Sequence, residues 1–392
     1  MKTASARSLE SLITRLAFAL LTAVSLGFPL RAQDFSVLHV FDPVTGDASL
    51  PEARMTRSRG NLYGTSGGGG AFDLGTVFKL NPTTGQVTVL YSFAGGADGE
   101  EPRGSLYIDR NHNFYGTTVV GGPSTFGTIF RLDASGQETV LYSFTGGTDG
   151  GEPYAGLTAD DAGNLYGTTW IGGDFGMGVV FKMTAAGQFS VMHSFSGPDG
   201  AYAFPGPLVL DKEGNLYGTT GLGGTGNAGV VFKMDGSGNV VVLHNFTGGD
   251  DGNNPEAGLI RDSEGNLYGT TYEGGTNGLG TVFKLGPTGT ESVLYSFNGG
   301  SADGKWPIAP LLRDENGHLF GTTRYGGTGN WGVVFELDEQ ANETVLHNFS
   351  WKRRGRVPDA GLVMDKNGDL YGSTSEGGIK NCGVLYKLTT KK

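Results

Sequence analysis

The stretch GNLYGTTYEGG at residues 265–275 has near copies in GNLYGTTGLGG at 214–224 and in GNLYGTTWIGG at 163–173. Aligned on the aromatic residue of its LYGT core, the phrase occurs seven times, at Tyr63, Tyr115, Tyr166, Tyr217, Tyr268, Phe320 and Tyr371. Successive copies lie 51 or 52 residues apart. A fixed period of this length is typical of propellers, solenoids and other repeat arrays.

Two further phrases repeat with the same period. One reads VLYSF or VLHNF and ends at Phe41, Phe93, Phe144, Phe195, Phe246, Phe297 and Phe349. The other reads GTVFKL or a close variant and begins at Gly75, Gly127, Gly178, Gly229, Gly280, Gly332 and Gly383. Seven copies of one unit of about 51 residues therefore account for nearly the whole chain after its N-terminal segment.

The fifth copy shows how one unit divides into strands. Short apolar runs at 257–262, 267–271, 281–285 and 292–297 are separated by turns rich in Gly, Asp and Asn, which is the pattern of antiparallel strands with short connections. No segment carries a helical apolar period, so we expect almost no helix. Four strands followed by a longer link containing Gly, Asp and Pro predict one propeller blade, and the fold class is all-β.

The order of the phrases at the two ends predicts how the ring closes. The first phrase, SVLHVF at 36–41, is a fourth strand, and the last, GVLYKL at 383–388, is a third strand. Each strand type occurs seven times only if the N-terminal strand completes the last blade. We therefore expect a seven-bladed β-propeller of four-stranded antiparallel blades, closed by the N-terminal strand, because a closed ring removes the free sheet edges that promote aggregation.

The composition favours a folded, exported protein. Gly accounts for 71 of the 392 residues, yet aromatic residues make up 11% of the chain, which is too many for a disordered segment. The net charge of −11 argues against nucleic-acid binding, which needs a basic face. Cys382 is the one cysteine, so stability must come from packing rather than from an intramolecular disulfide.

The N-terminal residues predict an export signal. Basic residues precede an apolar run at 16–30, and Ala32 offers a cleavage site, so residues 1–32 are expected to be a signal peptide and residues 33–392 a single propeller. The apolar run is shorter than the ~20 residues that span a bilayer. We therefore expect no membrane span after cleavage, a secreted, extracellular or periplasmic location, and a monomer.

The phrases GNLYGTT, GGxxxxGTVFKL and TVLYSFTGGxDGxxP, which follow one another over residues 35–388, resemble the GloVer tandem repeat of secreted bacterial proteins known as choice-of-anchor proteins. The resemblance implies an exported bacterial protein with a β-propeller-like fold and no characterised activity. Such proteins often carry a C-terminal sorting tail. This chain ends at KLTTKK directly after its last strand, which favours plain secretion over surface anchoring.

The repeat explains most residues that resemble catalytic or ligand-binding groups. A G-x-G-x-x-G match at 221–226 falls in a hairpin loop with no helix after it, so we attribute it to the abundance of Gly. The position that Tyr91, Tyr142 and Tyr295 occupy in three copies is occupied in the other four by His39, His193, His244 and His347. A residue that alternates with Tyr in this way indicates packing on an outer strand. We predict no catalytic residue.

Carboxylates in the links between blades are candidate metal ligands. Asp98, Asp149, Asp251 and Asp303 recur in GGxDG-like links, which we expect on one face of the ring, near a central channel. Oxygen ligands of this kind suit Ca²⁺. An Asp-Gly turn explains the same letters without a metal, and no other cofactor is expected.

The last link breaks the pattern, and this asymmetry gives the candidate ligand site. It reads WKRRGR at 351–356 where other copies carry GGxDG, and Trp306, Arg324 and Tyr325 are expected on the same face in neighbouring blades. Aromatic side chains beside Arg suit stacking and bidentate contacts with sugars, anionic polymers or a partner protein. The predicted ligand-binding residues are Trp306, Arg324, Tyr325, Trp351, Arg353 and Arg354. Drift in a repeat array, with Arg paired to nearby Asp, explains the same letters.

These observations favour a secreted binding or interaction propeller without evident catalytic activity, with a carbohydrate or protein ligand on the loop face. The rival hypothesis is an extracellular hydrolase or lyase acting on a polysaccharide or lactone, because propellers carry many activities and a fold does not fix a function. A structural envelope protein is the third alternative.

Overall fold

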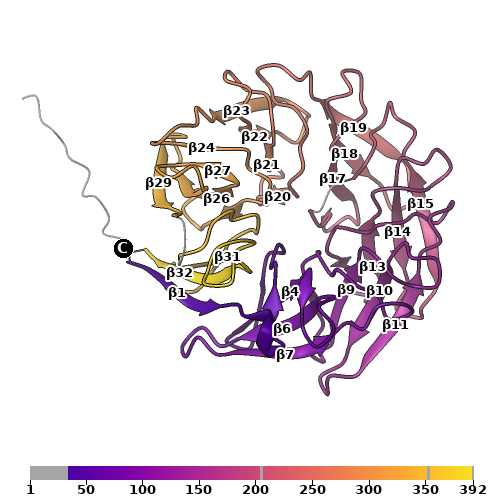
Figure 1. Ribbon diagram of the computed structural model, residues 1–392. Coiled ribbons are helices and arrows are strands. Elements are labelled where there is room, and N and C mark those ends of the chain that lie inside the picture. Colours follow the sequence, from indigo (N-terminus) through magenta and orange to yellow (C-terminus); the bar gives the residue numbers. More distant parts are fainter. Residues whose placement is uncertain (1–33, 204–205, 351–353, 391–392) are drawn as a thin grey trace, which may run out of the picture.

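The computed structural model describes residues 34–203, 206–350 and 354–390, and these residues form seven four-stranded antiparallel sheets arranged in a ring (Figure 1). The blades are numbered here in chain order. Blade 1 consists of β3 (Thr56–Ser58), β4 (Asn61–Ser66), β6 (Thr76–Leu80) and β7 (Val87–Ser92). The all-β, seven-bladed fold predicted from the repeats is therefore confirmed.

Blades 2 to 4 repeat this order. Blade 2 consists of β8 (Tyr107–Ile108), β9 (Phe114–Thr118), β10 (Thr128–Leu132) and β11 (Glu138–Ser143). Blade 3 consists of β12 (Thr158–Ala159), β13 (Leu165–Thr168), β14 (Val179–Met183) and β15 (Phe189–Ser194). Blade 4 consists of β16 (Val209–Leu210), β17 (Leu216–Thr220), β18 (Val230–Met234) and β19 (Val240–Asn245).

The last three blades follow the same plan. Blade 5 consists of β20 (Ile260–Arg261), β21 (Leu267–Thr271), β22 (Thr281–Leu285) and β23 (Glu291–Ser296). Blade 6 consists of β25 (Leu312–Arg313), β26 (Leu319–Thr323), β28 (Val333–Leu337) and β29 (Glu343–Asn348). Blade 7 consists of β30 (Val363–Met364), β31 (Leu370–Thr374), β32 (Val384–Thr389) and the N-terminal strand β1 (Asp34–Val40).

The N-terminal strand closes the ring as predicted. β1 pairs antiparallel with β32, with Ser36 opposite Lys387 and Val40 opposite Val384, and Figure 1 shows the indigo β1 beside the yellow β32. The pairing contains a register shift between Val37 and His39. The third and fourth strands of the other blades shift at the equivalent point, as between Val77 and Phe78. β1 therefore has the bulged geometry of a genuine fourth strand.

Close packing inside each blade explains why Gly stands in the LYGT phrase. A Cβ added at Gly64 would lie 2.6 Å from the Phe78 ring, and one added at Gly167 would lie 2.5 Å from the Phe181 ring. These two Phe side chains are fully buried. The Phe of GTVFKL thus covers the backbone of the second strand, and no larger residue than Gly fits beneath it.

The hydrophobic core lies between neighbouring blades rather than in one central mass. One cluster, for example, joins Tyr166, Val180 and Phe195 of blade 3 to Leu216 and Phe232 of blade 4. Hydrogen bonds add to this contact, since the Thr65 hydroxyl donates to the Gly104 carbonyl of the next blade at 2.9 Å. Closing the ring gives every blade two such neighbours.

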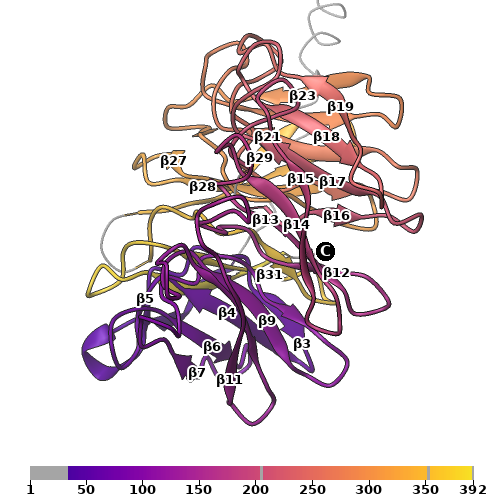
Figure 2. The same ribbon diagram turned by 90° about the vertical axis from the view of Figure 1, so that its right-hand side faces the viewer.

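Three short elements mark one face of the ring. They are the 3₁₀ helix η1 (Pro43–Thr45), the pair β2 (Ala48–Ser49) and β5 (Gly68–Gly69), and the pair β24 (Gly304–Lys305) and β27 (Tyr325–Gly326). Figure 2 places β5 and β27 on the same side of the ring. This side, called the loop face below, carries the blade-to-blade links and the loops between second and third strands.

The predicted signal peptide at 1–32 lies outside the described residues. In the part of the chain that is described, no helix has the length and apolar character needed to cross a membrane.

Candidate ligand-binding face

The aspartates predicted as metal ligands lie close to the outer strands. Asp98 accepts a hydrogen bond from the Tyr91 hydroxyl at 2.9 Å and another from the Ala94 N–H at 2.6 Å. Asp303 accepts one from the Tyr295 hydroxyl at 3.0 Å. The corresponding contacts elsewhere are Tyr142–Asp149 at 3.0 Å, His39–Asp47 at 2.6 Å, His193–Asp199 at 2.6 Å and His244–Asp251 at 3.5 Å. Each Asp therefore fastens the start of a link to the outer strand before it.

The expectation that Asp98, Asp149, Asp251 and Asp303 converge near the centre of the ring is therefore wrong. Their Tyr and His partners belong to β7, β11, β19 and β23, which follow the outside of the ring (Figure 1). The link has not yet turned inward where its Asp occurs. Over the described ranges, no group of three or more His, Cys, Asp or Glu side chains is placed to hold a metal ion. The geometry thus gives the predicted Ca²⁺ site no support.

The histidines of the outer strands are packing residues, as their alternation with Tyr indicates. His39, His193 and His244 are partly buried and face the link Asp of their own blade. His347 instead stacks on Phe35 of the closing strand, with ring centroids 3.8 Å apart and planes 2° from parallel. None of these rings shares a site with another.

The basic link between blades 6 and 7 is only partly described. Trp351 and Arg353, two of the predicted ligand-binding residues, lie outside the described residues, as does Lys352. Arg354 is exposed and follows Phe349 at the spacing at which Asp149 follows Phe144. Burial, together with the nearby Arg354 charge, lowers the pKa of His347 to about 4. Arg354 therefore lies near the outer strand β29, where other blades carry the link Asp.

The structure brings Trp306, Arg324 and Tyr325 together on the loop face. The Trp306 and Tyr325 rings meet edge to face at 5.6 Å, and the Arg324 guanidinium lies 6.0 Å from the Tyr325 ring centroid. Two neighbours were missed from the sequence. Tyr272 of blade 5 stacks on Trp306 at 5.6 Å, and the Lys305 ammonium lies 4.8 Å over the Trp306 ring. These five half-buried residues are called the aromatic site below.

The backbone of the ring fixes how Trp306 is presented. Its φ is +59°, a left-handed value that is uncommon for residues other than Gly. Its N–H donates to the Leu279 carbonyl of blade 5 at 2.9 Å, and its carbonyl accepts from the Arg324 N–H at 3.1 Å. The same left-handed position recurs in every blade, at Leu50, Glu101, Glu152, Tyr202, Asn254, Trp306 and Val357. The repeat thus holds the main chain while the side chain varies.

A second variable position lies at the inner edge of the ring, between a Pro and an Ala or Gly of each link. Its described members are Glu52, Arg103, Tyr154, Glu256, Ile308 and Asp359. Arg103 pairs with Glu52 of the preceding blade and with Glu101 at 3.1 Å. Asp359 lies 3.7 Å from Arg324 of the aromatic site. The variability of this position cannot be recognised in one copy of the repeat and becomes visible only when the copies are aligned.

Two carboxyl groups beside the aromatic site are partly desolvated. Burial raises the pKa of Asp359 to about 7, although the neighbouring Arg324 acts to lower it. Burial also raises the pKa of Glu256, whose carboxylate accepts a hydrogen bond from the Asn254 amide at 2.7 Å. A carboxyl group with a pKa near neutrality is able to give or take a proton at physiological pH.

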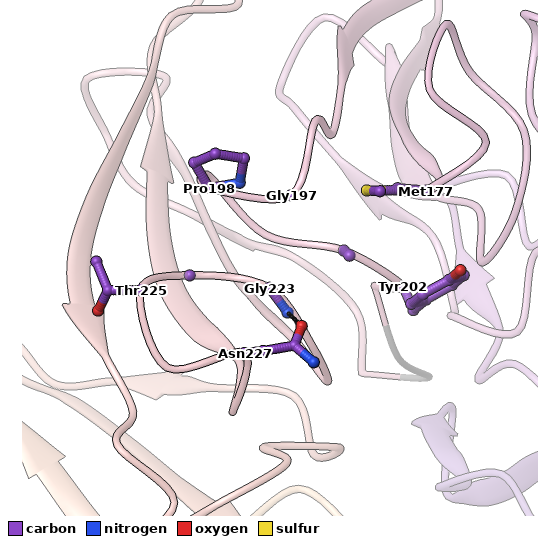
Figure 3. Close-up of a pocket in the computed structure, with 9 residues that line it drawn as sticks. Met177, Gly197, Pro198, Tyr202, Gly223, Thr225 and Asn227 are labelled. Carbon is purple, nitrogen blue, oxygen red and sulfur yellow. Dashed lines mark hydrogen bonds between the residues drawn. The ribbon is translucent and has the colours of Figure 1, made fainter.

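The opposite part of the loop face carries a second aromatic group. The Trp170 ring lies 5.8 Å from Tyr154 and 5.7 Å from Tyr202. Tyr202 also lines a shallow pocket of about 390 Å³ together with Met177, Pro198 and Asn227 (Figure 3). Asn227 accepts a bond from the Gly223 N–H at 3.1 Å, which orders the pocket wall. Aromatic surface is thus available at two places around the ring.

Comparison with known proteins supports the repeat and the fold. The model of the Gloeobacter/Verrucomicrobia repeat matches residues 26–207 and again 204–392. A search of curated proteins found no match.

Two solved structures share the ring architecture. The extracellular domain of BT4673 from B. thetaiotaomicron, described as a hybrid two component system, superposes with a TM-score of 0.59 at 12% identity, covering 90% of this chain and 39% of that one. An oligogalacturonate lyase in complex with manganese superposes with a TM-score of 0.58 at 14% identity, covering 91% and 93%. At such identities the likeness concerns the fold alone.

Proposed function

The chain belongs to the Gloeobacter/Verrucomicrobia repeat family, and from the side chains on its loop face we propose that it is an extracellular binding propeller that takes a carbohydrate ligand at the aromatic site. The observation that carries this proposal is the cluster of Tyr272, Trp306 and Tyr325, whose rings stay half-buried on the loop face although they contact one another. Aromatic faces pack against the apolar faces of sugar rings, while Arg and Lys bind hydroxyl or acidic groups.

The surroundings of the cluster favour a polar ligand. Arg324 and Lys305 lie over aromatic rings, and Glu256 and Asp359 stand next to them at the inner edge. Alternating aromatic and charged side chains supply stacking and hydrogen bonds within one small area. A flat protein interface would more often carry a larger apolar centre. A glycan is therefore the ligand that we propose first.

A glycan array followed by calorimetry on the best ligand tests the proposal. We expect Trp306→Ala and Tyr325→Ala each to weaken binding at least fivefold, because one stacked aromatic ring commonly contributes about 1 kcal/mol or more, which corresponds to about fivefold. Phe72→Ala is the matched control, since Phe72 is 60% exposed on blade 1 and lies outside the cluster. Equal binding by wild type and both site variants would refute the proposal, and capture of a protein but no glycan would redirect it.

A second candidate is a hydrolase or lyase acting on a polysaccharide. The observation in its favour is Asp359, a buried carboxyl group whose pKa of about 7 suits general acid or base catalysis. Incubating the protein with each glycan that binds, followed by measurement of new chain ends, tests for cleavage. In that case Asp359→Asn should abolish cleavage and leave binding within a few-fold of wild type. If no glycan that binds is cleaved, the enzymatic candidate is refuted and the binding function remains.

A further inference from the structure

A second repeat position at the inner edge of the ring, two residues after that of Glu52 and its equivalents, carries one large side chain among small residues. In each copy, this position comes directly before the apolar residue that leads into the first strand, such as Met55 in blade 1 and Leu106 in blade 2. The residues at this position are Arg54, Ser105, Gly156, Pro207, Gly258, Pro310 and Gly361. Six of the seven are Gly, Pro or Ser, and only blade 1 places a long charged group there. Like the aromatic site, this position departs from the repeat in one part of the ring, and it lies further along the link, closer to the first strand.

Small residues are needed here because neighbouring blades meet backbone to backbone. A Cβ added at Gly156 would lie 2.6 Å from the Ser105 carbonyl oxygen, and one added at Gly258 would lie 2.7 Å from the Gly206 Cα. Arg54 follows a different path. A Cβ added at Gly361 would lie 3.3 Å from both the Cβ and the Cδ of Arg54. The Arg54 side chain therefore runs along Gly361 of blade 7 and stays at the inner edge of the ring.

Arg54 differs in its electrostatic surroundings from the other partly buried arginines of the loop face. Arg103 has two carboxylate partners, Arg324 has Asp359 and Arg356 has Glu376. Among the described residues, no hydrogen bond or ion pair is made by the Arg54 guanidinium. Burial lowers its pKa, and nearby charges do not oppose this. An Arg side chain nevertheless remains protonated in proteins, so its charge lacks a counter-charge from the chain.

We propose that Arg54 binds a small oxyanion, a carboxylate or a phosphate, at the inner edge of the ring between blades 1 and 7. A guanidinium presents paired N–H donors that match two oxygens of one anion, a geometry that chloride does not satisfy. The side chain keeps partial contact with solvent, so an anion has access to it. Binding would neutralise a charge that is otherwise desolvated and unpaired. This site is separate from the aromatic site and does not depend on glycan binding.

The proposal requires the anion to stabilise the fold through Arg54. The full chain is melted in chloride buffer and in buffers where phosphate or acetate replaces chloride at constant ionic strength. A ligand that binds only the native state raises the melting temperature in proportion to the logarithm of its concentration. We expect such a rise with at least one oxyanion at millimolar concentration. A response to phosphate alone identifies a phosphate site, and a response to acetate identifies a carboxylate site.

Arg54→Met is the decisive variant because it keeps the stem over Gly361 and removes the charge. We expect it to melt higher than wild type in chloride and to lose the oxyanion response. Arg54→Lys keeps the positive charge but lacks the paired N–H donors of a guanidinium, so it should bind the oxyanion at least tenfold more weakly. Arg57→Met is the matched control, since Arg57 is exposed on the same blade, and it should respond as wild type does. An unchanged response in Arg54→Met, or no response in the wild type, would overturn the proposal.

Discussion

At the outer rim, six links place an Asp against a Tyr or His of the preceding strand, whereas the six described inner-edge positions hold five different residue types. The rim contacts are His39–Asp47, Tyr91–Asp98, Tyr142–Asp149, His193–Asp199, His244–Asp251 and Tyr295–Asp303. The inner-edge residues are Glu52, Arg103, Tyr154, Glu256, Ile308 and Asp359. One repeat unit thus yields a uniform rim and a varied centre.

The difference separates residues that build the ring from residues that give it a surface. A link Asp satisfies backbone N–H groups that would otherwise be left without partners where the chain leaves the outer strand, which accounts for its presence in six of the seven links. An inner-edge side chain is attached to a backbone already held by its neighbours, and its identity is free to change. Sequence variation between copies therefore points to the loop face as the place of function, and sequence uniformity points to folding.

The largest effect should come from removing a rim Asp. Asp303 is 5% exposed and accepts bonds from the Tyr295 hydroxyl at 3.0 Å and from the Asn298 and Gly304 N–H groups at 2.6 Å each. Asp303→Ala leaves all three donors unsatisfied and should lower the free energy of unfolding by about 2–3 kcal/mol. Urea unfolding measures this loss.

The matched variant is Tyr325→Ala on the loop face, which should lower the free energy of unfolding by about 1 kcal/mol or less because the ring there is only half-buried. If Asp303→Ala and Tyr325→Ala lower the free energy of unfolding equally, the distinction between a structural outer rim and a functional loop face is wrong. Asp303→Asn, which keeps an acceptor oxygen, should fall between them.

A smaller, pH-dependent effect should come from glutamates that face the rim Asp of the neighbouring blade. Burial, together with the nearby Asp303 charge, raises the pKa of Glu343 to about 8. Glu138 and Glu291, at the same repeat position, have pKa values of about 7 for the same reasons. Because these folded-state values exceed that of an unfolded Glu, the native state holds extra protons between about pH 4.5 and 8. Stability contributed by these groups is therefore lost as the pH rises through that window.

Glu343→Gln should remove part of this loss. We expect the variant to melt higher than wild type at pH 9 and to differ little at pH 5, with scanning calorimetry as the measurement. Glu343 is only partly buried, so water moderates the effect and a gain of a few degrees is the expected size. Combining it with Glu138→Gln and Glu291→Gln should increase the gain. An equal change at both pH values would show that packing, rather than ionisation, is responsible.

The ring could be predicted from the sequence because its information is periodic. The position of Tyr63, Tyr115 and their equivalents fixes the number of blades, and the type of the first and last phrases fixes the pairing of β1 with β32. The Gly of LYGT, read as part of a repeated phrase, proved to be a packing requirement beneath Phe78 and its equivalents. Each of these features depends on contacts that every copy makes with itself or with the next copy.

The candidate site was predicted only in part because its residues come from different repeat copies and from different points along the links. Trp306, Arg324 and Tyr325 were found since they depart from the repeat. Tyr272 occupies the same variable repeat position as Arg324 in the preceding blade, but it was missed because its contact with Trp306 joins two copies. The link Asp residues were placed at the wrong end of the link. A link runs from the rim to the centre, and the letters GGxDG do not state where along that path the Asp is held.

The seventh link offers the finest test of the comparison, because it has lost the rim contact naturally. Arg354 occupies the Asp position, and His347 has a pKa of about 4 owing to burial and to the Arg354 charge. Since this value lies below that of an unfolded His, the unfolded chain takes up the proton first, and stability is lost as the pH falls from about 6.5 towards 4. Arg354→Asp restores the acceptor that His244 has in Asp251.

We expect Arg354→Asp to raise the pKa of His347 and to add about 0.5–1.5 kcal/mol of stability at pH 6, the usual net value of one hydrogen bond. Titration of the His347 ring by NMR and urea unfolding at pH 6 measure the two quantities. Arg354→Ala separates the causes, because it removes the positive charge without supplying an acceptor. If both variants shift the His347 pKa equally, charge alone sets it, and the rim contact is not what distinguishes the other six links.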